Sequence, residues 1–277
     1  TKNHVHIDQA LKTPQFWQLW IMLCFNVTAG IGVIGVAKTM VSEIFGSNAV
    51  LIEMATTSTL VLLFFANYVV MLSAFNMVGR FIWASTSDYI GRKNTYHCFF
   101  VLGAILYSSI PYFALQASAD PTTVLYFAGF CIASMIIFTM YGGGFATIPA
   151  YLADIFGTMH VGGIHGRLLT AWSTAGVLGP LSITELRSYS LNQAINDLVQ
   201  KIDPSKFLDK FGAPVEQLDQ LVAAKTVSIA RLMEIVPEGT IDPTPSLYNT
   251  TMYAMAGLLV VAFVANLLMK PVNSKHH

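Results

Sequence analysis

The sequence predicts an all-α membrane protein with six transmembrane helices and a helical extracytoplasmic insert between the fifth and sixth of them. Two observations lead to this prediction. Of the 277 residues, 54% are hydrophobic and only 11% are charged, whereas a soluble domain carries about 25% charged residues. In addition, apolar runs of the roughly 20 residues that a helix needs to cross a bilayer recur along the chain. Helices suit this setting because they satisfy their own backbone hydrogen bonds in lipid.

The predicted spans are six apolar segments of the chain. They cover residues 16–40, 57–85, 95–115, 123–149, 163–184 and 247–269. The fifth is rich in Gly and Ala and is less hydrophobic than the others, and the first is too long and too far from the N-terminus for a signal peptide. The expected organisation is a cytoplasmic lead-in (1–15), five spans (16–184), the insert (185–246), the sixth span (247–269) and a cytoplasmic tail (270–277).

The basic residues near the span ends predict the orientation of the chain. With the N-terminus inside, the short outer loops contain no Lys or Arg in segments 41–56 and 116–123. The inner segments then contain Lys2, Lys12, Arg92, Lys93, Arg167, Lys270 and Lys275. An excess of Lys and Arg marks cytoplasmic loops, so we expect both ends of the chain inside, in a plasma or inner membrane.

The long outer segment, 185–246, is polar but has a helical pattern. Leu191, Ile195 and Leu198 recur at helical spacing, and Pro or Gly interrupts the segment near residues 203–204, 212–214 and 237–245. We expect two or three short amphipathic helices over the outer mouth of the bundle. They are either a packing appendage or a cap that gates substrate or docks a partner.

Arg80 is unusual because it lies inside the second apolar span. It precedes Asp88, near the inner end of that span, by eight residues, or ~12 Å at 1.5 Å per residue. A lone cation at such a depth costs at least ~2.5–3.5 kcal/mol. Two interpretations remain open: an ion pair with another span, or a cation facing a water-filled cavity that admits an anion.

Several other functions find no support in the sequence. The formal net charge is zero, which gives no indication of nucleic-acid binding. The three cysteines, Cys24, Cys98 and Cys131, are scattered through apolar runs, where we expect buried, inert thiols. The histidines form no metal-ligand pattern within a span, and no phosphate-binding loop or nucleophile–base spacing is present. We therefore expect no enzyme activity, no metal and no cofactor.

Two motifs resemble those of a known family. Gly79-Arg80, Trp83, Ser87-Asp88 and Gly91-Arg92-Lys93 resemble the loop signature between the second and third helices of a major facilitator half. The pattern 141–145 (YGGGF), Pro149, Asp154, Phe156-Gly157, His165-Gly166-Arg167 and 168–180 (LLTAWSTAGVLGP) resembles the oxalate/formate antiporter family of that superfamily. The resemblance covers the chain except the insert, and it implies the C-terminal six helices of a twelve-helix transporter, with the N-terminal half as a missing partner.

The resemblance also implies roles for individual residues. The Arg of the Asn-x-x-Gly-Arg segment, Asn76 to Arg80 here, binds a substrate carboxylate, which suits the planar, permanently charged guanidinium. Tyr141 and Phe145 match aromatic positions of the cavity; at spacing i, i+4 they share a helix face, although packing or lipid contact would also explain them. Trp172 stands where the family's oxalate carriers have a lysine, and this departure favours a monoanion over oxalate.

The inner turn suggests a gate. Asp88 can cap a helix start or pair with Arg92 or Arg167, and such contacts could hold the inner side closed while the outer side opens. The same residues could equally serve to cap and anchor the turn. Gating and anchoring are compatible.

The sequence thus predicts the C-terminal half of a secondary transporter for small organic anions resembling monocarboxylates. It would work by alternating access, driven by exchange or by a proton gradient. The alternative is a membrane scaffold or sensor that has a transporter-like fold, transports nothing, and could tolerate a buried, paired Arg80.

Overall fold

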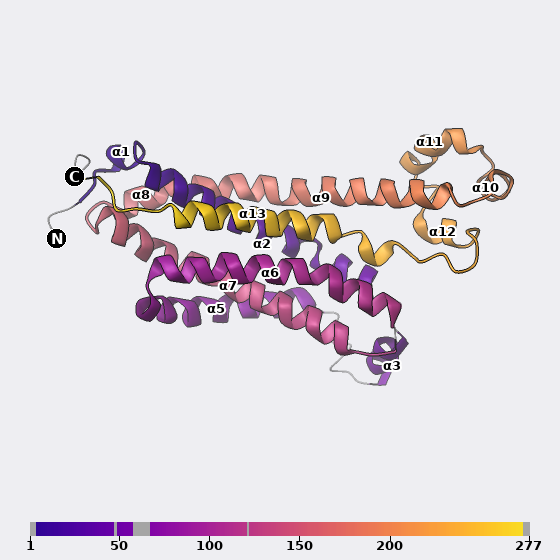
Figure 1. Cartoon of the computed structure of the whole chain (residues 1–277), viewed down its shortest axis with the longest axis horizontal. Coiled ribbons are helices and arrows are strands. Elements are labelled where there is room, and N and C mark those ends of the chain that lie inside the picture. The colour runs from indigo at the N-terminus through magenta and orange to yellow at the C-terminus, as the bar shows by residue number, and fades with distance from the viewer. Residues whose placement is uncertain (1–3, 47–48, 58–66, 121, 274–277) are drawn as a thin grey trace.

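The computed structural model describes residues 4–46, 49–57, 67–120 and 122–273, and this part of the chain contains helices and no strands. Long helices lie side by side in a bundle, with short helices at both of its ends (Figure 1). The helices are α1 (Ile7–Ala10), α2 (Pro14–Phe45), α3 (Ala49–Thr57), α5 (Tyr68–Ile90), α6 (Arg92–Ala119), α7 (Leu125–Phe156), α8 (Val161–Leu168), α9 (Thr170–Val199), α10 (Pro204–Phe211), η1 (Val215–Gln217), α11 (Leu218–Ala223), α12 (Ile229–Met233), η2 (Thr244–Ser246) and α13 (Asn249–Leu267).

Five helices of the described chain are long and apolar enough to cross a membrane, judged by length and composition. They are Pro14–Phe45, Tyr68–Ile90, Arg92–Ala117, Leu125–Phe156 and Thr244–Leu267. Five of the six predicted spans fall on these helices, although residues 58–66 of the second lie outside the described residues. The predicted span 163–184 falls on α8 and α9, which are not among the five, in keeping with the lower hydrophobicity of that segment.

The two ends of the bundle differ in what they contain. Both chain termini lie at one end, together with α1 and α8, whereas α3 and the cluster of α10, α11 and α12 lie at the other (Figure 1). The insert is therefore at the end opposite to the termini, the relative arrangement that the charge pattern predicts. We refer to the end with the termini as the inner end.

The predicted boundary between the fifth span and the insert, at residue 185, lies inside a continuous helix. Helix α9 runs unbroken from Thr170 to Val199, so the first 15 residues of the predicted insert extend it by ~22 Å. The short helices α10 to α12 gather at the far end of α9 (Figure 1). The insert therefore prolongs the bundle instead of lying across its outer mouth. Ile195 and Leu198 of α9 and Leu232 of α12 are buried and join these elements.

The described part of the predicted lead-in is folded onto the inner end. Val5 and Ala10 are fully buried, and the Val5 amide donates to the carbonyl of Phe156 at 3.0 Å. Thr13 caps α2 by accepting from the amide of Phe16 at 3.4 Å. The lead-in therefore ties the start of α2 to the end of α7.

Glycines let the helices of the bundle approach one another closely. A Cβ atom on Gly79 of α5 would lie 2.1 Å from the carbonyl oxygen of Thr139, and one on Gly142 of α7 would lie 1.9 Å from that of Asn76. Helices α5 and α7 therefore cross backbone to backbone, as small residues allow in membrane proteins. A similar contact joins α2 and α9, where a Cβ on Gly179 would lie 3.1 Å from the Thr28 carbonyl oxygen.

Replacing Gly142 with alanine is expected to destabilise the protein, because the new methyl group meets a backbone atom that no rotamer change can move. Overpacking of this kind costs about 1–3 kcal/mol. Thermal unfolding of the detergent-solubilised protein, followed by circular dichroism, should show a lowered midpoint. Gly257→Ala is the matched control, because its Cβ would meet no atom within 4 Å. Equal midpoints for the two variants would contradict the close crossing.

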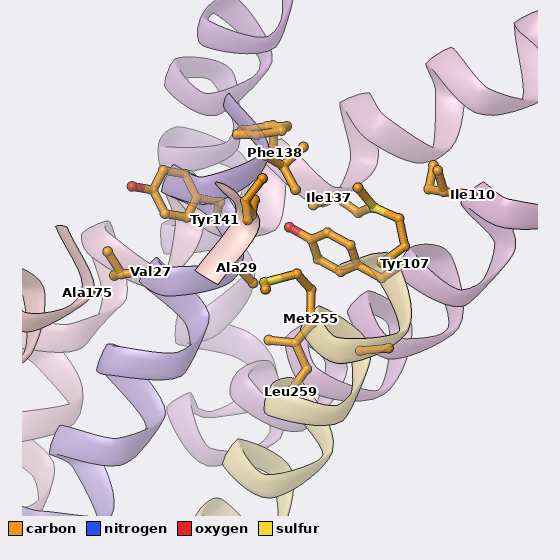
Figure 2. Packing of buried hydrophobic residues seen from close by; sticks show 14 of the residues in the cluster. Val27, Ala29, Tyr107, Ile110, Ile137, Phe138, Tyr141, Ala175, Met255 and Leu259 are labelled. Carbon is orange, nitrogen blue, oxygen red and sulfur yellow. The ribbon is translucent and has the colours of Figure 1, made fainter. Parts of the chain in front are cut away.

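The apolar core lies between α2, α6, α7 and α13. Tyr107, Ile137, Met255 and Leu259 come together there from three of these helices (Figure 2). Tyr141 borders the same core and packs on α2, where a Cβ on Gly30 would lie 2.3 Å from its ring. The core therefore holds Tyr141 in place. Phe145 lies one helical turn further along α7, on the same face of that helix.

Candidate functional site

Arg80 and Phe145 meet beside the crossing of α5 and α7. The guanidinium carbon of Arg80 lies 5.9 Å from the centre of the Phe145 ring, within the range of a cation–π contact. Arg80 directly follows Gly79 on α5, and Phe145 follows the glycines of α7. The close backbone crossing therefore brings the cation to the aromatic face.

Phe145 is the central aromatic residue of the site. Its ring packs against Trp172 of α9, with the centroids 3.9 Å apart and the planes tilted by 42°, and it makes a T-shaped contact with Tyr141 at a centroid distance of 5.2 Å. Tyr141 is buried, whereas Trp172 is 37% exposed. The structure thus brings together four predicted site residues from three helices, and Phe145 lies between Arg80 and Trp172. Pro149 has no N–H to donate to the Phe145 carbonyl, which also loosens the helix here.

Asn76, the fifth predicted site residue, lies in the crossing itself. A Cβ on Gly142 would lie 1.9 Å from its backbone oxygen and 2.8 Å from its Oδ1 atom. Its side chain is half-buried against α7, one turn of α5 before Arg80. Asn76 is therefore part of the helix contact that holds Arg80, and its amide adjoins the site.

The charge of Arg80 has no anionic partner among the described residues. Its guanidinium makes neither an ion pair nor a hydrogen bond there, and the remaining residues include no Asp or Glu. The residue is exposed, among the exposed apolar side chains of Met77, Val78, Phe81 and Ile82. The ion-pair interpretation of Arg80 therefore finds no partner, and the cation stands on an open face of the bundle.

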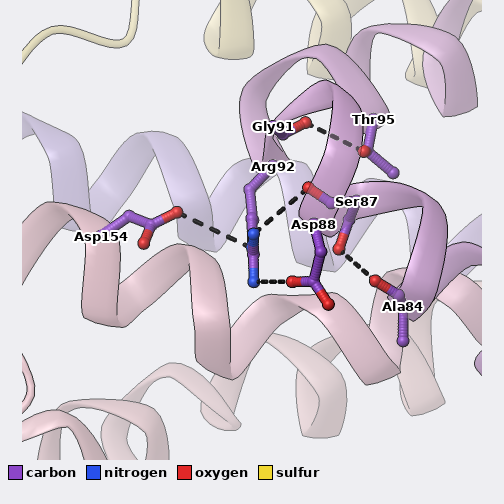
Figure 3. Close-up of polar contacts among 7 residues, drawn as sticks. All are labelled: Ala84, Ser87, Asp88, Gly91, Arg92, Thr95 and Asp154. Carbon is purple, nitrogen blue, oxygen red and sulfur yellow. Dashed lines mark hydrogen bonds and ion pairs between the residues drawn. The ribbon is translucent and has the colours of Figure 1, made fainter.

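At the inner end, Arg92 joins two carboxylates (Figure 3). Its guanidinium pairs with Asp88 of α5, donates to the Ser87 carbonyl at 3.2 Å, and has its Nε atom 3.8 Å from Asp154 Oδ2 of α7. The turn between α5 and α6 is the single residue Gly91, whose φ of +85° favours glycine. Of the two partners that we expected for Asp88, Arg92 is the one with which it pairs. Arg92 also lies close to a second carboxylate, that of Asp154.

Arg167, the third predicted gate residue, does not pair with Asp88. Its Nη1 atom lies 2.8 Å from Asp8 Oδ1 and donates to the Ile7 carbonyl at 3.2 Å. The hydrogen bond from Arg167 holds the pKa of the Asp8 carboxyl below its ordinary value. The reason is that the folded lead-in, which the sequence did not reveal, brings Asp8 next to α8. The inner end therefore has two separate ion-pair groups.

At the outer end, sequence reasoning missed a polar cluster of Glu43, Arg187 and Tyr248. Arg187 of α9 pairs with Glu43 of α2 and donates through Nε to the Tyr248 hydroxyl at 3.0 Å, and that hydroxyl donates to Glu43 at 2.6 Å. The cluster ties α2, α9 and the start of α13 together where the insert begins. Its signal in the sequence is weak: one acid and one base near the outer ends of two predicted spans.

No cluster of three or more His, Cys, Asp or Glu side chains that could hold a metal ion is present in the described residues.

Cys24 and Cys131 are buried, as expected. Cys98 is exposed, which contradicts our expectation for it, because its position on α6 faces outward from the bundle.

No protein-family model matches the chain. A search of curated proteins finds similarity to an oxalate:formate antiporter from Oxalobacter formigenes, with 31% identity over 180 residues. The aligned stretch covers 65% of this chain, and the chain spans 37% of the length of that relative. Together with the five helices that are long and apolar enough to cross a membrane, this similarity identifies a multi-pass membrane protein.

Proposed function

We propose that the chain is the C-terminal six-helix half of a major facilitator transporter for small organic anions. Its similarity to an oxalate:formate antiporter supports the class of substrate. In this proposal α9 is the fifth of the six spans, and a second six-helix half covers the exposed face of α5. The complete transporter works by alternating access, in which the two halves rock about a site between them.

The observation that carries the proposal is the unpaired cation of Arg80 on an exposed apolar face. Lipid cannot cover this face at low cost, because a charge in the hydrocarbon region is expensive. A water-filled cavity removes that cost and lets an anion reach the guanidinium. The planar guanidinium can bind both oxygens of a carboxylate, and Phe145 holds it in place. A non-transporting scaffold needs no such reachable cation, so Arg80 favours the transporter.

We further propose that the preferred substrates are monocarboxylates such as formate, lactate or pyruvate. A carboxylate bound to Arg80 has the Phe145 ring beside it and the Trp172 indole beyond, and neither can neutralise a second carboxylate. Burial of an unpaired second charge would cost several kcal/mol. Small monoanions with an apolar end match one cation and an aromatic wall.

The inner ion pairs are proposed gate contacts. Arg92 links the α5–α6 turn to the inner end of α7 through Asp88 and Asp154, and Arg167 links α8 to the lead-in. Opening towards the inside would separate these groups. Exchange of anions is the favoured coupling, because the acids Glu43, Asp88 and Asp154 lie near the ends of α2, α5 and α7 and not near the level of Arg80.

Uptake into liposomes tests the proposed function. The full-length protein should take up labelled formate, lactate or pyruvate, and these anions should compete with one another more strongly than oxalate does. Empty liposomes provide the background. Absence of uptake for every mono- and dicarboxylate tested would reject the transporter assignment in favour of the scaffold.

Labelling of single cysteines tests the topology and, with it, the assignment of α9 as a span. In a background without Cys24, Cys98 and Cys131, cysteines are placed at Lys93, Thr122 and Gln217. We expect a membrane-impermeant maleimide added to intact cells to label positions 122 and 217 but not 93, because α6 separates 93 from 122 and α6, α7 and α9 separate 93 from 217. Protection of both 93 and 217 would show that α9 does not cross.

A further inference from the structure

Helix α5, which carries Arg80, packs on α7 but buries few of its own side chains. Its buried residues are Tyr68, Leu72, Gly79 and Ser87, and much of the rest of the helix is exposed. A helix held in this way could rotate about its own axis, and a rotation would carry the Arg80 guanidinium away from Phe145. Some contact near Arg80 must therefore fix the rotation of α5.

Trp83, one turn beyond Arg80, makes that contact. Its indole Nε1 donates to the hydroxyl of Thr139 on α7 at 3.2 Å. The Thr139 hydroxyl donates its own proton to the Ile136 carbonyl at 2.7 Å, so its oxygen is free to accept from the indole. The Trp83 ring also meets the Phe99 edge at 5.0 Å, and a Cβ on Gly143 would lie 2.6 Å from Trp83 Cβ.

Thr139 contacts α5 at two residues, one on each side of Arg80. Its backbone oxygen lies against Gly79, the residue before Arg80, and its hydroxyl holds Trp83, the third residue after it. Two attachments on either side of one residue fix both the height and the rotation of the helix there. Arg80 then projects past the crossing towards Phe145, which lies six residues beyond Thr139 on the same helix.

We propose that Trp83 and Thr139 are the positioning residues for Arg80: their hydrogen bond sets the rotation of α5 that aims the guanidinium at the substrate site. This inference rests on the proposed function. Neither residue touches the substrate in this arrangement. Their effect reaches the carboxylate through the placement of the guanidinium.

The test compares Thr139→Val, Thr139→Ser and Trp83→Phe in the full-length protein reconstituted in liposomes. Valine keeps the branched shape and removes the acceptor, serine keeps the acceptor, and phenylalanine removes the indole donor. We expect the KM for the monocarboxylate to rise about five- to tenfold in Thr139→Val and Trp83→Phe, because a displaced guanidinium loses part of its charge-assisted hydrogen bonding to the carboxylate, with the maximal rate within about twofold of wild type. Thr139→Ser keeps the acceptor and should therefore have the wild-type KM.

Thr86→Val is the matched control, because the Thr86 hydroxyl on the same helix bonds within that helix, to the Ile82 carbonyl at 2.8 Å. It should leave KM unchanged. An unchanged KM in both Thr139→Val and Trp83→Phe would overturn the inference, and so would a KM in Thr139→Ser as high as that in Thr139→Val. If Thr139→Val or Trp83→Phe fails to fold, the KM of the variant that folds decides whether the inference holds. Failure of the proposed function looks different, because wild type would then show no uptake or Arg80→Ala would transport normally.

Discussion

Replacement of Arg80 with alanine is expected to reduce monocarboxylate uptake by at least about 30-fold, the largest effect of any single substitution at the site. Removal of one partner of a desolvated charge pair costs about 2–5 kcal/mol, and each 1.4 kcal/mol corresponds to about a tenfold change. No other cation of the described chain contacts Phe145, so none can take over. Helix α5 should still fold, because Arg80 is exposed and makes no hydrogen bond or ion pair with the described residues.

Arg80→Lys should also weaken transport sharply, by about tenfold or more, although the charge is kept. Lysine presents a compact ammonium in place of a planar fork, so it loses the paired geometry with the carboxylate. The order wild type, lysine, alanine would therefore separate the contribution of geometry from that of charge.

The measurement for the Arg80 variants is the initial rate of labelled formate or lactate uptake at several concentrations in liposomes. Lys38→Ala serves as the control, because Lys38 is likewise an exposed cation on an apolar helix, α2, but lies nearer to the outer end. It should transport at close to the wild-type rate, since a lysine there can extend its ammonium towards the interface. Normal transport by Arg80→Ala would show that the site has been misidentified.

Replacement of Trp172 with lysine is expected to shift the preference of the transporter towards dianions. The new ammonium would replace the indole that now packs against Phe145, and it would offer a partner to the second carboxylate of oxalate. A hydrogen bond to a charged group contributes about 1.5–3 kcal/mol. The ratio of oxalate to formate affinity should therefore rise by about 10- to 100-fold, measured as competition against labelled substrate.

Trp172→Phe is the control for this shift, because it shortens the aromatic wall without adding charge. Its preference should stay with monocarboxylates, with at most a modest rise in KM. A wild-type protein that takes oxalate best would contradict our assignment of Trp172, as would an unchanged preference in Trp172→Lys. The first outcome would mean that the other half supplies a second cation.

Much of this arrangement follows from local properties of the sequence. Hydrophobicity is summed over neighbouring residues, so five of the predicted spans coincide with long apolar helices. The turn at Gly91 is also a local feature, because its φ of +85° is a backbone conformation that favours glycine. Tyr141 and Phe145 share a face because four residues make about one helical turn, and their rings do meet at 5.2 Å.

The errors arose where the answer depends on a distant part of the chain. Arg167 was expected near Asp88 but pairs with Asp8, because nothing in the polar lead-in indicated that Val5 and Ala10 would be buried. The insert was expected as short helices over the outer mouth, yet its first residues continue α9 as a helix to Val199. Polarity marks where a helix leaves an apolar environment and carries no information about where its hydrogen bonds stop.

The sequence by itself determined which segments are apolar helices, that Arg80 lies deep within one of them, and which aromatic residues share a face. Each of these depends on spacing along one helix. Only the tertiary structure decided three contacts between helices. Phe145 contacts both Arg80 and Trp172, Thr139 accepts a hydrogen bond from Trp83, and Glu43 pairs with Arg187. The physical reason is that such contacts depend on the crossing and rotation of whole helices. Glycines allow two of these crossings: Gly79 and Gly142 let the backbones of α5 and α7 touch, and Gly179 does the same for α2 and α9.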